Sequence, residues 1–204
     1  MDKNIGSITR SKICRILAEE NVHKTRRELA ELERGLGKSP GELPDLWGYI
    51  FEDFPEEYMS PTGDPSREEL AYYTALTLFS MHQRGHDTKT NPMHKDKVSL
   101  GQAVRILAGP DTKSDSFDRI RKRFNICVSA PDIYGLSTRL RGLIQQMKRA
   151  NIPLDYGKLA NDLYFYQIPG QTEKVRLRWG QDFYRPIARA EGETAAAEQT
   201  ANTD

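Results

Sequence analysis

The sequence contains few cysteines: Cys14 and Cys127 are the only two among its 204 residues. They lie far apart and lack the spacing of metal ligands, so we expect reduced, buried thiols. Long apolar runs are missing too, because the longest stretch without a charged residue, 70–83, is well short of the roughly 20 residues that cross a bilayer. No apolar secretory segment follows Met1. These features predict a cytoplasmic protein with no membrane partner.

The common signatures of catalysis are absent as well. The chain has no GxSxG, Walker, GxGxxG or HExxH motif and no paired CxxC. The sharpest enzymatic alternative is a metal-dependent nuclease or hydrolase using His82, His86 and His94, since imidazoles four residues apart on a helix can share a zinc ion. Gly85 interrupts that helix, and the other two histidines fall in a loop. We therefore expect no enzyme, no catalytic residue, no cofactor and no bound metal.

The charge of the chain is nearly balanced overall but strongly segregated. The formal net charge is only +1, yet residues 52–69 carry −6, residues 70–190 carry +10 and residues 191–204 carry −4. Within 119–149, eight basic residues stand against Asp132 alone. Such a concentration of positive charge favours a polyanion or an acidic protein surface as the partner.

Helical signals dominate the sequence. Ser66 with Glu69 and Ser99 with Gln102 are capping boxes, and each precedes an apolar stretch. The first stretch, LAYYTALTLFSMHQR, is apolar on nearly every side and predicts the central buried helix. The segment KVRLRWGQDFY fits both a strand and a helix, and we predict a helix because no other segment alternates convincingly. The fold class that follows is all-α.

We expect a compact helical bundle protein that can divide into two small packed bundles. An N-terminal bundle would cover 1–110 and include an acidic loop at 52–66 and a polar, basic loop at 85–97 that we predict to be mobile. A C-terminal bundle would cover 111–190 and carry the basic face. The acidic tail 191–204 has a composition typical of disorder.

The basic face is centred on the stretch SFDRIRKRF. Helical spacing buries an apolar stripe that begins at Phe117 and turns Arg119, Lys122 and Arg123 to the opposite side. The next helix repeats the arrangement, with Arg141 and Arg149 outside its apolar stripe. These side chains could form a track for a phosphate backbone, because arginine binds phosphate through a planar, bidentate fork. A solvated face with local salt bridges is equally consistent with the composition.

Two further features are weaker. Arg26 and Arg27 form a second basic pair, partly offset by nearby glutamates. A group of aromatic residues could stack on bases as in single-strand binders, although core packing explains most of them better; the group is Tyr164, Phe165, Tyr166, Trp179, Phe183 and Tyr184.

Taken in order, five segments resemble the CasB family, the small subunit of the type I-E CRISPR surveillance complex Cascade. They are TLFSMHQRG, PMHKDKVSLGQAVRILAG, SFDRIRKRF, LRGLIQQMKRANIPLDYGKLANDL and VRLRWGQDFY. The resemblance extends over about 78–184 and, more loosely, to the Arg26–Arg27 pair and the region around Trp47. The acidic stretch 52–69 and the acidic tail are not part of the pattern.

The resemblance implies an all-helical, non-enzymatic subunit in RNA-guided antiviral defence. Its implied partners are the backbone and large subunits of Cascade, a second copy of itself, the guide RNA and the target DNA. The subunit would stabilise the R-loop by binding the displaced non-target strand. The positions carried over are Arg26 or Arg27, Arg119 with Lys122 and Arg123, and Arg141; Arg149 joins them from the charge pattern. A helical adaptor whose basic face binds an acidic protein remains the other alternative.

Overall fold

The computed structural model describes residues 4–186, and within them the chain is helical without a β-strand. The prediction of an all-α protein is confirmed. The α-helices are α1 (Ile5–Ala18), α2 (Val22–Arg34), α3 (Trp47–Phe51), α4 (Arg67–Gln83), α5 (Leu100–Ala108), α6 (Asp115–Val128), α7 (Ile133–Arg149), α8 (Tyr156–Tyr166) and α9 (Thr172–Tyr184). Three short 3-10 helices, η1 (Pro40–Glu42), η2 (Pro44–Leu46) and η3 (Glu56–Tyr58), accompany α3 before α4.

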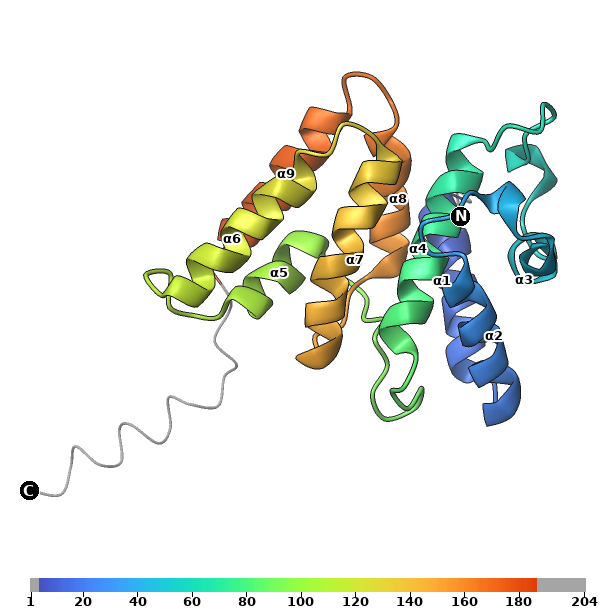
Figure 1. Cartoon of the computed structure of the whole chain (residues 1–204), viewed down its shortest axis with the longest axis horizontal. Helices are drawn as coiled ribbons and strands as arrows, with labels where there is room; N and C mark the ends of the chain where they lie inside the picture. The colour runs from blue at the N-terminus through green and yellow to red at the C-terminus, as the bar shows by residue number, and fades with distance from the viewer. Residues whose placement is uncertain (1–3, 187–204) are drawn as a thin grey trace, which may run out of the picture.

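Helix α4 is the central helix, as predicted from its apolar sequence. Every residue from Glu69 to Gln83 is buried, and α1, α2, α7 and α8 pack around it. In Figure 1 α4 lies between α7 and the pair α1 and α2. A helix that is apolar on all sides has no face to offer to water, so its neighbours must enclose it.

Helices from the two ends of the sequence pack together. Helix α8 packs against both α1 and α4, while α5 packs against α6, α7 and α9. Apart from Met93, the buried apolar residues from Ile5 to Phe183 belong to one connected core. The boundary predicted at residue 110 falls in the loop between α5 and α6, and this packing crosses it in both directions. The division into two bundles stays a prediction.

Side-chain caps fix where most helices begin. Both predicted capping boxes form: the Ser66 hydroxyl accepts from the Glu69 amide at the start of α4, and Ser99 and Gln102 make the same pair at the start of α5. Ser114, Asp132 and Asp155 cap α6, α7 and α8 in the same way. Each cap satisfies an amide that would otherwise lack a partner, and this sets the register of the apolar face that follows.

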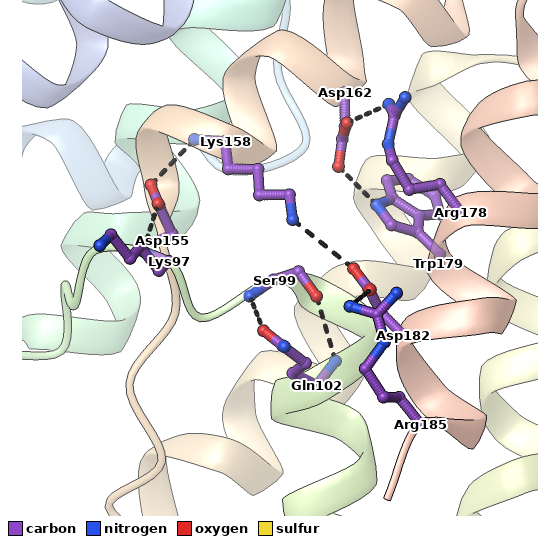
Figure 2. A network of polar contacts seen from close by, with 10 residues as sticks. All are labelled: Lys97, Ser99, Gln102, Asp155, Lys158, Asp162, Arg178, Trp179, Asp182 and Arg185. Carbon is purple, nitrogen blue, oxygen red and sulfur yellow. Dashed lines mark hydrogen bonds and ion pairs between the residues drawn. The ribbon is translucent and has the colours of Figure 1, made fainter. Parts of the chain in front are cut away.

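The segment KVRLRWGQDFY forms helix α9, as predicted. The reason is visible at Trp179, which is fully buried and stacks against Tyr166 with ring centroids 5.9 Å apart. Its Nε1 donates a hydrogen bond of 2.6 Å to Oδ2 of the buried Asp162 in α8 (Figure 2). Arg178 pairs with the other oxygen of the same carboxylate. This network ties α9 to α8.

The loop 85–97 differs from the mobile loop that the sequence suggests. The buried Gln83 side chain accepts from the Met93 amide at 2.7 Å and donates to the carbonyls of His86 and Asn91. The Met93 carbonyl also accepts from the amide of Leu154, just before α8. The polar composition of the loop does not reveal this arrangement, because the hydrogen bonds to its backbone come from the buried side chain of Gln83.

Two smaller expectations meet different outcomes. Cys127 is buried, as predicted, but Cys14 is exposed on α1, so the prediction of two buried thiols is wrong for Cys14. The predicted disordered tail, 191–204, lies outside the described residues. None of the helices within 4–186 combines the length and apolar character that a bilayer crossing requires.

Candidate nucleic-acid interface

Helices α6 and α7 enclose a groove of about 860 Å³ on the surface, called here the α6–α7 groove. Five basic and two acidic side chains line it, which gives a net charge of +3. The lining charged residues are Asp115, Asp118, Arg119, Lys122, Arg123, Arg139 and Arg149. Four of the seven residues predicted for nucleic-acid binding therefore lie together.

The sequence places these charges in the groove through two apolar stripes. Phe117, Ile120 and Phe124 turn one face of α6 into the core, where Phe117 and Phe124 pack against Phe183 of α9. On α7, the stripe from Ile133 to Met147 is buried in the same way. Because the inner faces are apolar, the charged residues between them are held at the surface, and the two helices bring them together.

Three arginines in the groove are free of ion pairs. Arg119, Arg123 and Arg149 are exposed, and none makes a salt bridge or a side-chain hydrogen bond within residues 4–186. An arginine without a local carboxylate keeps its guanidinium available for an external anion, and its fork matches a phosphate. These three residues are the strongest candidates for contacts to an external anion.

Lys122 is different, because an acidic neighbour already holds it. Its Nζ lies 2.7 Å from Asp118 Oδ2, and Arg121 pairs with the other oxygen of the same carboxylate. The pKa of Asp118 is lowered by these hydrogen bonds, first from Lys122 and then from Arg121. Lys122 therefore lines the groove with its charge partly neutralised.

On α7, two basic side chains have structural roles. Arg139 lines the groove and donates to the Ile126 carbonyl at 2.6 Å, which fastens the last turn of α6 to α7. Lys148 points away from the groove and donates to the Met81 carbonyl of α4 at 2.7 Å. Burial lowers the pKa of Lys148. Lys148 thus braces α7 against the central helix.

The other predicted residues lie apart from the groove. Arg141 is exposed on α7 but does not line it. Arg26 and Arg27 are exposed on α2, which lies at the opposite side of the molecule from α6 in Figure 1. Neither arginine has an ion pair in the part of the chain that the structure describes. They form a separate basic surface.

Sequence reasoning missed several lining residues. Arg139, Ile126, Gln145 and Gln146 line the groove but are not among the residues predicted from the sequence. The spacing of Arg139, Gln146 and Arg149 at i, i+7 and i+10 on α7 is the signal that could have identified this face. Ile126 carries no such signal, because an exposed isoleucine (61% accessible) reads as a core residue in a sequence.

Each histidine of the metal alternative has a hydrogen-bond partner within the fold, and Tyr156 serves two of them. His82 Nδ1 lies 2.9 Å from the Tyr156 hydroxyl, and burial lowers the pKa of His82 to about 3. His86 Nδ1 lies 3.1 Å from Asn91, and His94 Nδ1 accepts from the Tyr156 amide.

Within residues 4–186, the three-residue group with metal-ligand geometry is His94, Asp96 and Asp155, without His82 or His86. Both Asp96 oxygens already accept from Arg10, and Asp155 accepts from the amides of Lys97 and Lys158. The carboxylates are therefore engaged within the fold.

The aromatic residues near the C-terminus mostly pack in the core. Tyr166, Trp179 and Phe183 are buried, whereas Phe165 and Tyr184 are 40% and 65% exposed. None of these residues lines the α6–α7 groove. The exposed apolar side chain that lines the groove among the arginines is Ile126.

Within the described residues, an all-helical core presents a cationic groove between α6 and α7, and positive charge of this kind favours a polyanion. Comparisons with known proteins identify the family. Residues 28–184 match the family described as CRISPR-associated protein Cse2, and the chain belongs to this family, also called CasB. Membership supports a role as a subunit of Cascade.

Two solved structures are similar to the whole fold. The crystal structure of CasB from Thermobifida fusca has 31% sequence identity and a TM-score of 0.72, covering 89% of this chain and 98% of that one. The crystal structure of M. ruber CasB, at 21% identity and a TM-score of 0.62, covers 99% and 100% and shows the fold alone. A comparison with curated protein sequences found no significant match.

Proposed function

We propose that this chain is a non-catalytic subunit of Cascade that stabilises the R-loop by binding the displaced non-target DNA strand in the α6–α7 groove. The observation that carries the proposal is the set of three unpaired arginines, Arg119, Arg123 and Arg149, in one groove of net charge +3. In this proposal the chain packs along the guide-RNA backbone, next to the backbone and large subunits and a second copy of itself.

The energetics make such a role sufficient without catalysis. Opening a target duplex against a guide RNA exchanges one duplex for another of similar stability. A few phosphate contacts to the displaced strand can therefore shift the balance toward the open state. The groove has the chemistry for this, because guanidinium groups recognise the backbone without reading the bases.

Salt dependence of strand binding tests the proposal. The full chain would be titrated with a fluorescent single-stranded oligonucleotide over a series of salt concentrations. Three phosphate contacts predict a slope of log affinity against log salt of about −2, since each contributes about 0.7 on single strands. The variant Arg119→Gln/Arg123→Gln removes two contacts, so the slope should become shallower by about 1.4.

Two matched variants serve as controls. Lys122→Gln should change the slope less than either arginine substitution, because Lys122 is already paired with Asp118. Arg26→Gln/Arg27→Gln tests the separate surface on α2. If the slope changes only in the α2 variant, strand binding belongs to the surface on α2 and not to the groove. A salt-independent affinity in the parent protein would refute the proposal.

A further inference from the structure

The second surface of interest is a small hollow beside α3, the helix that lies at the opposite end of the molecule from α6 in Figure 1. The residues that line it include Pro40, Trp47, Phe51, Gly63, Asp64 and Pro65. Its volume is about 150 Å³. That is much smaller than the roughly 300–1,000 Å³ of typical ligand pockets. The hollow has room for one long side chain and not for a cofactor.

Trp47 is the main feature of this hollow. Its side chain is held by a hydrogen bond of 3.0 Å from Nε1 to the Pro40 carbonyl, yet the residue remains 47% exposed. A fixed tryptophan with an open face is unusual for a monomer surface, because tryptophan is highly buried on average. Tryptophan and arginine are enriched where proteins dock on each other, and an aromatic face binds a cation.

The hollow lies in the most acidic part of the chain. Residues 52–69 contain seven acidic residues and only Arg67 as a basic one. Six of these carboxylates make no ion pair within residues 4–186; they are Glu52, Glu56, Glu57, Asp64, Glu68 and Glu69. Asp64 is fully at the surface and lines the hollow beside Trp47. The free negative charge repels a phosphate backbone and attracts a basic protein surface.

We propose that this hollow is a protein docking site, which receives an arginine or lysine side chain from a different subunit of the same complex. The stem of that side chain would lie on the Trp47 ring, and its charged end would pair with Asp64. The surrounding carboxylates would steer the basic surface into place. The inference rests on the proposed role as a Cascade subunit but does not depend on strand binding.

A second copy of the chain is the alternative occupant. Three of the unpaired arginines that it could offer, Arg119, Arg123 and Arg149, lie in its α6–α7 groove, so docking through them would compete with the strand. Arg26 and Arg27 lie outside that groove, so the crosslinking experiment below must separate a second copy from a different subunit.

Reconstitution of the complex tests the proposal. The variants Trp47→Ala and Asp64→Lys would be assembled with the remaining subunits and guide RNA, and the affinity of the chain for the complex would be measured. Each should weaken incorporation at least about tenfold, as expected for a central aromatic or charged anchor. Trp47→Phe keeps an aromatic face and should retain most of the affinity.

The control is Glu20→Lys, an equal charge reversal at an exposed residue between α1 and α2. It should incorporate within about twofold of the parent, and circular dichroism would establish that every variant is folded. Single-strand binding by the isolated chain should be unchanged in Trp47→Ala and in Asp64→Lys. The groove variants should lose strand binding and still incorporate into the complex. Either proposal can therefore fail without the other.

A photo-crosslinking amino acid at position 47 identifies the occupant directly. A crosslink to a peptide of another subunit that contains arginine or lysine is the expected result. Parental incorporation of both Trp47→Ala and Asp64→Lys would overturn the proposal. So would a crosslink to a second copy of the chain, or to nucleic acid.

Discussion

The stability of the protein should depend on the hydrogen bond between Trp179 and Asp162, and this dependence should change with pH. The substitution Trp179→Phe keeps an aromatic ring against Tyr166 but removes the donor that lies 2.6 Å from Asp162 Oδ2. Asp162 is only 3% exposed, so water cannot replace that donor easily. A hydrogen bond to a charged group contributes about 1.5–3 kcal/mol.

That loss should be visible in a melting experiment. For a domain of about 150–250 residues, each 1 kcal/mol shifts the melting temperature by about 2–4 °C, so the variant should melt roughly 3–12 °C below the parent at neutral pH. Tyr134→Phe is the matched control, because it removes a hydroxyl from an aromatic residue that is 55% exposed. Its free energy of unfolding should stay within about 0.5 kcal/mol of the parent value.

The pH dependence gives the sharper test. Burial raises the pKa of Asp162, against the lowering influence of Arg178 and Trp179. A carboxyl whose pKa is higher in the folded state contributes most below its unfolded pKa of about 3.9, and that contribution is lost as pH rises through the folded pKa. Removing the Trp179 donor raises the folded pKa further. The variant should therefore lose more stability at pH 7 than at pH 4.5, and a stability difference that is equal at both values would refute the reasoning.

Two other perturbations have clear expected outcomes. Gly101→Ala would place a Cβ atom 2.2 Å from the Trp179 carbonyl and 2.8 Å from Asp182 Cβ, so it should destabilise by about 1–3 kcal/mol in urea unfolding. Gly180→Ala on α9 meets no atom within 4 Å and should instead stabilise by about 0.5–1 kcal/mol; equal effects would contradict the close approach of α5 and α9. His82 should make the protein less stable in acid, because its folded pKa of about 3 lies below the unfolded value of about 6.5, and stability present above pH 6.5 is lost as pH falls. Between pH 6.5 and 5 the loss of unfolding free energy due to His82 amounts to about 2 kcal/mol. Urea unfolding of His82→Phe should not show this loss, and an identical decline in the variant would assign the acid sensitivity to other groups.

Local signals in the sequence predicted the helices well. Capping boxes at Ser66 and Ser99 have short-range geometry, so their outcome depends on residues within one helical turn. The apolar stripe on α6 determined which side Arg119 and Arg123 would face. The helix at Trp179 was harder, since its alternation fits two periods and only the contact with Asp162 on another helix decides between them.

Contacts between distant residues were beyond sequence reasoning. Nothing near Gln83 indicates that its side chain will bond to Met93 and the loop that precedes it. The pairing of Lys122 with Asp118 could have been expected from their i, i+4 spacing, but the freedom of Arg149 depends on what α6 places opposite it. The hollow at Trp47 is a similar case, because exposure of a tryptophan is a property of its surroundings.

The contact between α1 and α8 also bears on how the protein is made. The Gly6 amide donates to the Asn161 side chain, 155 positions further along the chain. At about 5–20 residues per second, a ribosome needs roughly 8–31 seconds to synthesise the second partner after the first. Until α8 is made, α1 and the central helix α4 lack the helix that packs against both of them. Nascent chains of this protein should therefore depend on chaperones until α8 emerges, and joining Cascade should follow release from the ribosome.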